Sequence, residues 1–503
     1  MTIRFPIIVR EAFKLLPDEA SHIASKPPQK ENVFTPADHA GALDPHRAVV
    51  VGDRGTGKSF WSSVLIDRDI RNLVAQLYPR LPLAQVEAGL GFSDDLMAVN
   101  HPTPSVIANI VNEGYSAEDL WRAVMLCLAP IPTPGAPNVG PSPDWLKWTQ
   151  WVAADPARRN AAFRALDEAL ARQNRIYVLV FDALDLLAED WRGIRKQMDG
   201  IIQLALAVRA LKAVRIKMFI RPDMADDDRL WAVGDASKLR HNMVELNWKR
   251  RDLYGLLWTL LANSHCHPPI NCSGEDPATA FREFCYREFN ARFDHVDEVW
   301  RPSANLTEDE ELQQKVFRAL AGDYMGAGPT KGDTYKWVPN HISDAAGFAA
   351  PRSFLLAMKE AAENAKSNET VLDVAGIQAG ARKASKVRVE ELSEDYRWMK
   401  QVLNDMQHLV VPLPEADLVA RWQERGTLRK LKEQAETERY DNRYIPPGNV
   451  LEVLEEREAY RQLIDQMVRL KIFFRLNDGR INMPDLFRLQ AKVKRKGGMK
   501  PRA

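Results

Sequence analysis

The stretch from residue 52 to residue 59 has the residue types and the spacing that hold a chain of phosphates. It reads GDRGTGKS and matches the pattern G-x-x-x-x-G-K-S/T at each fixed position. Glycines let the backbone curl so that successive N–H groups point inward toward an anion. Lys58 can then reach the β- and γ-phosphates, and the Ser59 hydroxyl can bind Mg²⁺. The stretch therefore predicts a site for ATP and Mg²⁺.

The elements on either side must position this loop. Residues 48–51 form an apolar run that predicts a buried strand, and residues 59–66 predict the helix that leaves the loop. The positive end of that helix adds to the field at the phosphates. The alternative is a chance match, which the two flanking elements disfavour. The residues expected to bind the nucleotide are Gly52, Asp53, Arg54, Gly55, Thr56, Gly57, Lys58, Ser59 and Phe60.

An acidic residue that could bind the metal follows a strongly apolar strand. Residues 175–187 read RIYVLVFDALDLL, which predicts a buried strand that ends at Asp182. A carboxylate there would lie on the Mg²⁺ side of the phosphates, or the strand could end in an acid by chance. Asp185 would either polarise the attacking water or cap the next helix. No glutamate follows Asp182, so we expect slow hydrolysis.

Two later arginines could report the state of the nucleotide. Residues 214–224 predict a strand that ends at Arg221, which could sense the γ-phosphate through charge-assisted hydrogen bonds or simply be exposed. Residues 347–365 predict a helix whose first turn contains a proline followed by Arg352. Arg352 could distinguish ATP from ADP if this helix forms a lid over the nucleotide.

The segment between these arginines carries more positive charge. Residues 244–246 predict a short strand, and Asp252 opens an amphipathic helix with leucines at helical spacing. Nearby basic side chains could include a finger that reaches a neighbouring protomer, or they could form a solvated face. These side chains are Arg240, Arg250 and Arg251.

Composition limits the class of protein. The 503 residues are 45% apolar and 27% charged, which is ordinary for a soluble globular protein of about three domains. No run of about 18 apolar residues occurs, so we expect no transmembrane helix and no membrane partner. The net charge of +1 provides no global attraction to nucleic acid. The N-terminus lacks the features of a signal peptide.

Cysteine usage indicates a reducing compartment. Four cysteines imply no disulfide framework, so we expect a cytoplasmic protein. One local cluster could supply zinc ligands but lacks a C-x-x-C knuckle, and a loop with incidental His and Cys is the favoured alternative. Its members are His265, Cys266, His267 and Cys272.

The C-terminal block predicts a helix followed by a hairpin. Residues 458–470 form an amphipathic helical pattern, and residues 472–476 and 480–483 are short strand patterns around Asn-Asp-Gly. This is the back half of a winged helix, which could bind double-stranded DNA with the basic tail or serve protein contacts. The basic side chains of the tail are Lys492, Lys494, Arg495, Lys496, Lys500 and Arg502.

The order of these motifs resembles the bacterial STAND-like and AAA+-related P-loop ATPases, near the ORC/Cdc6-like clade, over roughly residues 46–365. The resemblance implies an α/β fold: a P-loop NTPase core with a parallel αβα sheet, followed by a helical lid and, from the C-terminal pattern, a winged-helix domain. It also implies roles for single residues. Lys58 and Ser59 would be the Walker A pair and Asp182 the Walker B acid. Arg221 would be sensor 1 and Arg352 sensor 2.

The expected organisation has five parts. They are residues 1–45 as an N-terminal extension, 46–262 as the P-loop core, 263–365 as an insertion and helical lid, 366–435 as a helical region, and 436–503 as a winged helix with a basic tail.

The resemblance leaves three functional hypotheses. The first is an ATP-dependent switch of an anti-phage or other conflict system, in which ATP binding changes oligomerisation or the engagement of a separate effector protein. The second is a DNA-binding initiator or loader that uses the winged helix. The third is a scaffold that binds nucleotide without turnover. A homo-oligomer is compatible with each hypothesis.

Overall fold

The structure is a computed structural model and describes most of the chain. The described residues are 5–17, 26–95, 97–138, 140, 142–188, 190–265, 276–438, 444, 446 and 450–495. The chain divides into two compact units. We call Ser21–Asn247 the sheet unit, and Met1–Ala20 together with Trp248–Ala503 the helical unit.

The sheet unit is built on five parallel strands in the order β2-β3-β4-β1-β5. Parallel strands bring their carboxyl ends to the same edge of a sheet, which is where ligands bind in open α/β folds. Strand β4 lies between β1 and β3, so the end of β4 faces both the loop after β1 and the acid after β3. The strands are β1 (Val49–Val51), β2 (Val86–Phe92), β3 (Ile176–Phe181), β4 (Val214–Ile220) and β5 (Val244–Glu245).

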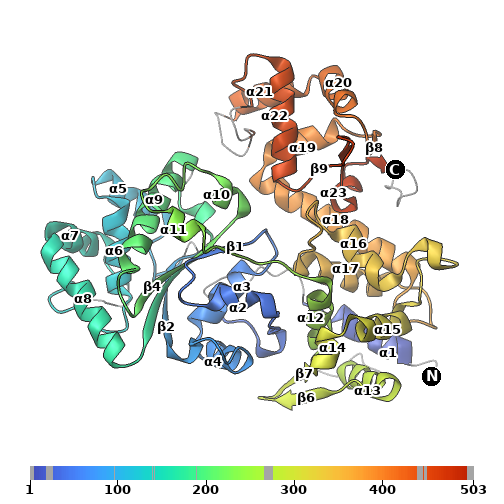
Figure 1. The fold of residues 1–503 in the computed structure, drawn as a ribbon, viewed down its shortest axis with the longest axis horizontal. Helices are drawn as coiled ribbons and strands as arrows, with labels where there is room; N and C mark the ends of the chain where they lie inside the picture. Colours follow the sequence, from blue (N-terminus) through green and yellow to red (C-terminus); the bar gives the residue numbers. More distant parts are fainter. Residues whose placement is uncertain are drawn as a thin grey trace. The chain divides into compact units, whose positions relative to one another are not determined.

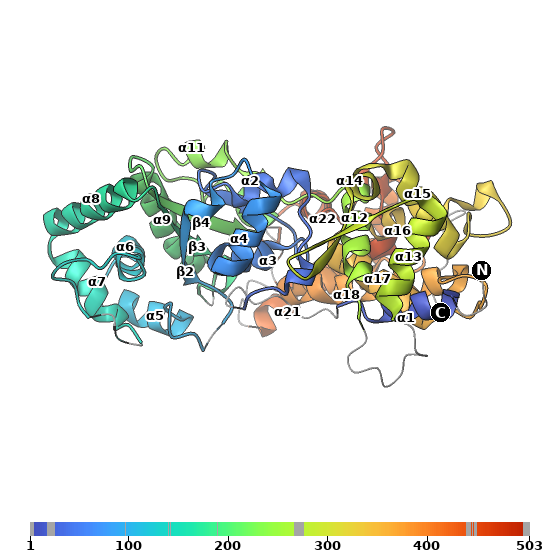
Figure 2. The same ribbon diagram turned by 90° about the horizontal axis from the view of Figure 1, so that it is seen from below.

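Apolar side chains cover both faces of this sheet. Val50 and Val180 belong to a core shared with helices α3 and α4, whereas Val49 and Leu179 belong to a second core shared with α6 and α9. The alternation follows the two-residue period of a strand. Figures 1 and 2 show these helix pairs on opposite faces of the sheet. The expected αβα core with a parallel sheet is therefore confirmed.

The helices of the sheet unit vary in length, and an irregular segment interrupts them. Residues 130–143, which are rich in proline, contain no helix or strand at the described positions. The helices are α2 (Ala40–Leu43), α3 (Lys58–Ile66), α4 (Arg68–Leu77), α5 (Pro104–Asn112), α6 (Ala117–Cys127), α7 (Trp145–Ala154), α8 (Pro156–Arg172), α9 (Trp191–Val208), α10 (Pro222–Asp226) and α11 (Ser237–Arg240).

The first part of the helical unit is a bundle with one β-hairpin. Helices α17 and α18 pack closely because Gly376 and Gly380 of α18 bring its backbone against carbonyls of α17, where a side chain would not fit. The elements are α1 (Phe5–Lys14), α12 (Arg250–Ala262), α13 (Pro277–Phe289), β6 (Phe293–Val296), β7 (Val299–Pro302), α14 (Ala304–Glu308), α15 (Glu310–Ala321), α16 (Thr334–Ile342), α17 (Pro351–Glu363) and α18 (Val374–Asp395).

The division between the units differs from the expected domain boundaries in two places. Helix α12, expected in the P-loop core, is part of the helical unit because it is buried on nearly all sides against α13, α14, α15, α17 and β7. The N-terminal segment also does not form one extension. Helix α1 packs on α13 and α17, and Arg10 donates hydrogen bonds to the carbonyl oxygens of Val371 and Thr370, each 2.8 Å long. The remaining boundaries stay predictions.

The second part of the helical unit contains the expected helix and hairpin. Helix α22 precedes the antiparallel pair β9 and β10, whose strands are shorter than predicted. The parallel pairing of β8 with β11 was not predicted. The elements are α19 (Arg397–Asn404), β8 (Val410–Val411), α20 (Glu415–Arg425), α21 (Thr427–Thr437), α22 (Glu456–Arg469), β9 (Phe474–Arg475), β10 (Ile481–Asn482), α23 (Asp485–Arg488) and β11 (Lys494–Arg495). Among the described helices, none is long and apolar enough to cross a membrane.

Candidate functional site

The loop between β1 and α3 has the geometry that the glycine spacing predicts. Gly55 and Gly57 have φ angles of 80° and 103°, a region that favours glycine. At Gly52 a Cβ atom would lie 2.5 Å from Thr56 Oγ1. The Thr56 hydroxyl donates a 2.8 Å hydrogen bond to the Asp53 carbonyl, which closes the turn. The loop therefore leads into a nine-residue helix with its N–H end at the turn.

The side chain of Lys58 folds back onto the backbone of its own loop. Lys58 Nζ donates hydrogen bonds to the carbonyl oxygens of Gly52 and Asp53, at 2.8 Å and 3.1 Å. Burial lowers the pKa of Lys58, and the negative charges of Asp182 and Asp185 oppose this effect. Lys58 thus lies within the field of both acids that follow β3.

The two residues expected to hold a metal are brought together. Strand β3 ends at Phe181, and the carboxylate of Asp182, which is 1% exposed, accepts a hydrogen bond from the Ser59 side chain. Burial raises the pKa of Asp182 to about 6, although the bond from Ser59 and the charge of Lys58 lower it. The Oδ2 atom of Asp182 has no hydrogen-bond partner among the described residues.

These donors fit Mg²⁺. The ion takes oxygen ligands and usually binds through one or two protein groups together with phosphate oxygens and water. A buried carboxylate oxygen without a partner is unfavourable unless a cation or donor completes it. The Ser59 hydroxyl and the free Asp182 oxygen supply two such ligands on one side of the loop.

Arg221 lies at the end of β4, where the sequence predicted it, and it is already paired. Its guanidinium donates to Asp223 through two bonds of 3.0 Å and 2.7 Å, and to Asp185 Oδ2 at 3.1 Å. Strand β4 ends at Ile220, and Pro222 begins the short helix α10. The Arg221 side chain is only 13% exposed, so the ion pair is shielded from water.

Asp185 does not cap the next helix, which was one of the two expected roles. It lies in the short 3-10 turn Leu184–Leu186 after β3, and the N-cap of α9 is Asp190. Asp185 instead binds Arg221. Its proposed effect on the attacking water stays a prediction.

Arg352 lies in the first turn of α17, as predicted. Its Nη1 atom donates a 2.7 Å hydrogen bond to Glu391 of α18, within the helical unit. Its role toward a nucleotide stays a prediction. The other arginines considered for a finger also have partners: Arg240 pairs with Asp228, Arg250 with Glu310, and Arg251 with Asp252.

Sequence reasoning missed Asp94, which follows β2. This strand pairs in parallel with β3, and the Asp182 N–H donates a 3.0 Å hydrogen bond to the Phe92 carbonyl. Asp94 is half-buried, and its Oδ1 atom has no hydrogen-bond partner among the described residues. A strand pattern followed by Ser-Asp-Asp was the available signal, because it places an acid beside the end of β3.

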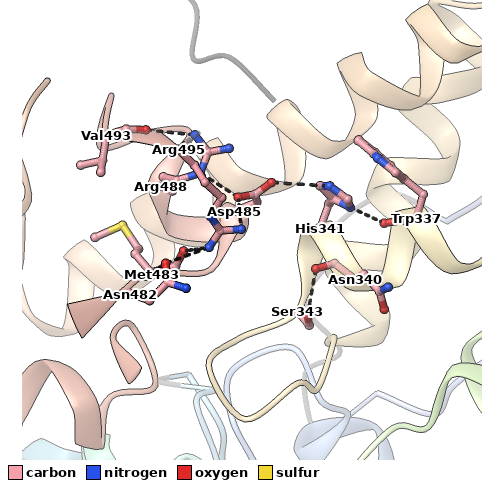
Figure 3. A network of polar contacts seen from close by, with 10 residues as sticks. All are labelled: Trp337, Asn340, His341, Ser343, Asn482, Met483, Asp485, Arg488, Val493 and Arg495. Carbon is pink, nitrogen blue, oxygen red and sulfur yellow. Dashed lines mark hydrogen bonds and ion pairs between the residues drawn. The ribbon is translucent and has the colours of Figure 1, made fainter. Parts of the chain in front are cut away.

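The C-terminal basic residues are not equivalent to one another. Figure 3 shows Arg488 and Arg495 converging on Asp485, at 2.7 Å and 3.0 Å, with His341 on the other side of the carboxylate. Arg495 also donates to the Met483 carbonyl at 2.5 Å. Arg495, which the sequence grouped with the basic tail, is therefore bound to Asp485 and to the Met483 carbonyl within the helical unit. Lys492 and Lys494 are exposed, whereas Lys496, Lys500 and Arg502 lie outside the described residues.

The possible zinc cluster is mostly outside the described part of the chain. Cys266, His267 and Cys272 are not described, and His265 Nδ1 lies 3.1 Å from Asp276 Oδ2. Among the described residues, no group of three or more His, Cys, Asp or Glu side chains is arranged to hold a metal.

No family model matches the chain, and no curated protein sequence matches it. Three solved structures are similar to it along most of their length. One is the ORC1 protein of Aeropyrum pernix in complex with DNA, which is 14% identical with a TM-score of 0.33. The match covers 94% of this chain and 93% of the ORC1 chain. A second is the ORC2 protein of Aeropyrum pernix in ADPNP-ADP complexes, which is 12% identical with a TM-score of 0.35. The match covers 87% of this chain and 84% of the ORC2 chain. A third is the Walker-type ATPase paby2304 of Pyrococcus abyssi, which is 12% identical with a TM-score of 0.38. The match covers 93% of this chain and 98% of the paby2304 chain.

Proposed function

We propose that the sheet unit binds ATP with Mg²⁺ and hydrolyses it. The observation that carries this proposal is the hydrogen bond between Ser59 and Asp182 beside the loop. The Oδ2 atom of Asp182 is buried there without a hydrogen-bond partner among the described residues. A core carboxylate that served only the fold would be expected to have its hydrogen bonds satisfied. A metal bound to phosphates accounts for the position of both residues.

Each residue then has a defined task. The N–H groups of residues 52–57 and of the first turn of α3 bind the phosphates. Lys58 exchanges its bonds to the Gly52 and Asp53 carbonyls for bonds to the β- and γ-phosphates. Ser59 and Asp182 hold the metal, and Arg221 binds the γ-phosphate. Mg²⁺, when bound, neutralises charge on the β- and γ-oxygens.

We further propose that the nucleotide controls a switch. Arg221 is paired with two carboxylates, and a phosphate can form the same charge-assisted hydrogen bonds with its guanidinium. Exchange of these partners would couple ATP to a rearrangement at the end of β4, whereas the role of Arg352 toward the nucleotide stays a prediction. A change of oligomeric state or partner binding would follow, and sedimentation with ATP, with ADP and without nucleotide tests it. Identical sedimentation in all three conditions would contradict the switch.

Two biological settings are proposed for this switch. One is an initiator-like ATPase of the ORC/Cdc6 type, the group to which the archaeal ORC structures named above belong. The other is a conflict or defence system with a separate effector, which rests on the sequence resemblance alone.

The initiator setting requires DNA binding by the helical unit. Helix α22, the hairpin β9–β10 and the exposed Lys492 and Lys494 support it, whereas Arg495 is committed to Asp485. Binding through lysines would weaken steeply with salt. Replacement of the exposed Lys492 and Lys494 by alanine should weaken it, and a salt-insensitive interaction would argue against this setting.

The proposed function is tested by ATP hydrolysis of the purified chain, with and without double-stranded DNA. Lys58→Ala should abolish turnover. Lys238→Ala is the matched control, because Lys238 is an exposed lysine of the same unit that pairs with Asp235. Turnover that depends on Lys58 and rises with DNA would favour the initiator setting. Nucleotide binding without any turnover would instead support a scaffold.

A further inference from the structure

The edge of the sheet beside the phosphate-binding loop carries several carboxylates, and most of them have a partner. Asp182 accepts a hydrogen bond from Ser59, and Arg221 binds both Asp185 and Asp223. Asp95 Oδ1 accepts a 3.0 Å hydrogen bond from the Met97 N–H. Each of these four carboxylates therefore has at least one partner within the protein.

Asp94 differs from Asp95, Asp185 and Asp223. Its Oδ1 atom is buried without a hydrogen-bond partner among the described residues, as is the Oδ2 atom of Asp182 on the metal side of the proposed site. Burial raises the pKa of Asp94, and the charges of Asp95 and Asp185 raise it further. The charge of Asp94 in turn raises the pKa of Asp182, so these acids lie near one another.

The backbone around Asp94 is fixed on both sides. Phe92, two residues earlier, is joined to the Asp182 N–H by a 3.0 Å hydrogen bond. The buried Ser93 hydroxyl lies 2.9 Å from His101 Nε2 and accepts a 3.2 Å hydrogen bond from the Asp95 N–H. Asp94 is therefore held next to the metal-side acid by structure that does not use its own carboxylate.

Hydrolysis also needs a carboxylate that the Walker B strand does not supply at its usual place. The residue after Asp182 is Ala183, which has a φ of 52° and no polar side chain. In the proposed site Ser59 and Asp182 already supply the oxygen ligands of the metal. A role toward water therefore fits Asp94, which lies on the neighbouring strand β2.

We infer that Asp94, on the strand next to Walker B, accepts a hydrogen bond from the water that attacks the γ-phosphate and so orients it. The inference rests on the proposed ATPase function. The water oxygen forms a bond to the γ-phosphorus, and the bond from this phosphorus to the β–γ bridging oxygen breaks. The electron pair leaves with ADP, and both protons of the water end on the product as dihydrogen phosphate.

The test compares Asp94→Asn with Asp95→Asn in the full chain. Asp94→Asn should lower kcat about 100-fold, with the KM and the calorimetric Kd for ATP within about twofold of wild type. It should also weaken binding of ADP with aluminium fluoride, a mimic of the transferring phosphate, while ADP alone binds normally. Asp95→Asn should leave all these values near those of wild type, and Asp94→Glu should recover part of kcat.

The results distinguish the role of Asp94 from the proposed ATPase function. If wild-type turnover depends on Lys58 but Asp94→Asn retains more than about half of kcat, the ATPase function stands and the role of Asp94 is wrong. A parallel loss of ATP affinity or thermal stability in Asp94→Asn would also overturn it, because the residue would then be structural. No Lys58-dependent turnover in the wild-type protein would overturn both.

Discussion

The guanidinium of Arg221 binds Asp185, with Nη1 and Oδ2 3.1 Å apart, and this ion pair joins the end of β4 to the turn after β3. Both side chains are partly shielded from water, at 13% and 26% exposed. Asp223 binds the same guanidinium from the start of α10. A γ-phosphate beside Arg221 would compete with two carboxylates, so its binding would change the contacts between adjacent strand ends.

Arg221→Ala should reduce the preference for ATP over ADP. A charge-assisted hydrogen bond contributes about 2 kcal/mol, so ATP affinity should fall roughly 30-fold while ADP affinity changes little. Calorimetric titration with each nucleotide measures both values. Arg195→Ala is the control, because Arg195 forms a comparable ion pair with Asp227. An equal loss for ATP and ADP would mean that Arg221 does not read the γ-phosphate.

Gly52→Ala should disturb the phosphate-binding loop without changing its charge. The new Cβ atom would lie 2.5 Å from Thr56 Oγ1 and 3.1 Å from Lys58 Cγ, so both side chains must move. We expect ATP affinity to fall by about tenfold, since displaced charge-assisted bonds each contribute more than 1 kcal/mol. Gly234→Ala is the control because a Cβ atom there meets nothing within 4 Å. Unchanged affinity for Gly52→Ala would show that the loop tolerates the displacement.

Lys217 should make the stability of the sheet unit depend on pH. It is fully buried on β4, donates to the carbonyls of Asp44 and Arg47, and has a pKa that burial lowers from 10.5 to about 7. Between about pH 7 and pH 10.5, Lys217 carries a proton in the unfolded chain and has lost it in the folded chain. Stability therefore rises with pH through this window, and the penalty for the buried amine is fully present below about pH 7.

Lys217→Met removes this titration. The difference in unfolding free energy between wild type and the variant should change by roughly 1 kcal/mol per pH unit between pH 7.5 and 9.5, in favour of wild type at higher pH. Denaturant unfolding at several pH values measures it. A difference that does not vary with pH would show that Lys217 stays charged in the folded protein.

Arg488→Met should destabilise the C-terminal part of the helical unit. Arg488 is fully buried and binds Asp485 at 2.7 Å and the Val493 carbonyl at 3.0 Å. Removing one partner from a buried ion pair costs about 3 kcal/mol, and because Asp485 keeps Arg495 as a partner the loss here should be smaller, about 2 kcal/mol. Thermal unfolding and hydrogen exchange over residues 474–495 should report the loss. Lys494→Met changes an exposed side chain of the same segment and should leave both measurements unchanged.

The sequence predicted the elements whose signals are local. The glycine spacing predicted the loop, and the apolar run before Asp182 predicted β3 and the acid at its end. The Asn-Asp-Gly turn predicted the hairpin β9–β10. Each of these features depends on a few neighbouring residues, and the structure places them as expected.

The features that the sequence did not predict depend on contacts between distant segments. Asp94 gains its position only because β2 pairs with β3, and this pairing is not visible in either strand alone. Arg495 belongs by sequence to the basic tail, and its ion pair with Asp485 depends on how the chain folds. Helix α12 likewise joins the helical unit through its packing and not through its position in the chain.

The central claim is that Lys58, Ser59 and Asp182 form a site for ATP with Mg²⁺, and calorimetric titration of ATP into the purified chain tests it most directly. Wild type and Lys238→Ala should bind ATP with equal affinity and more tightly with Mg²⁺ than with EDTA. Lys58→Ala should lose roughly 30-fold or more, because a charge-assisted contact contributes about 2 kcal/mol. Binding that is the same in Lys58→Ala as in wild type, or no binding to either, would contradict the claim.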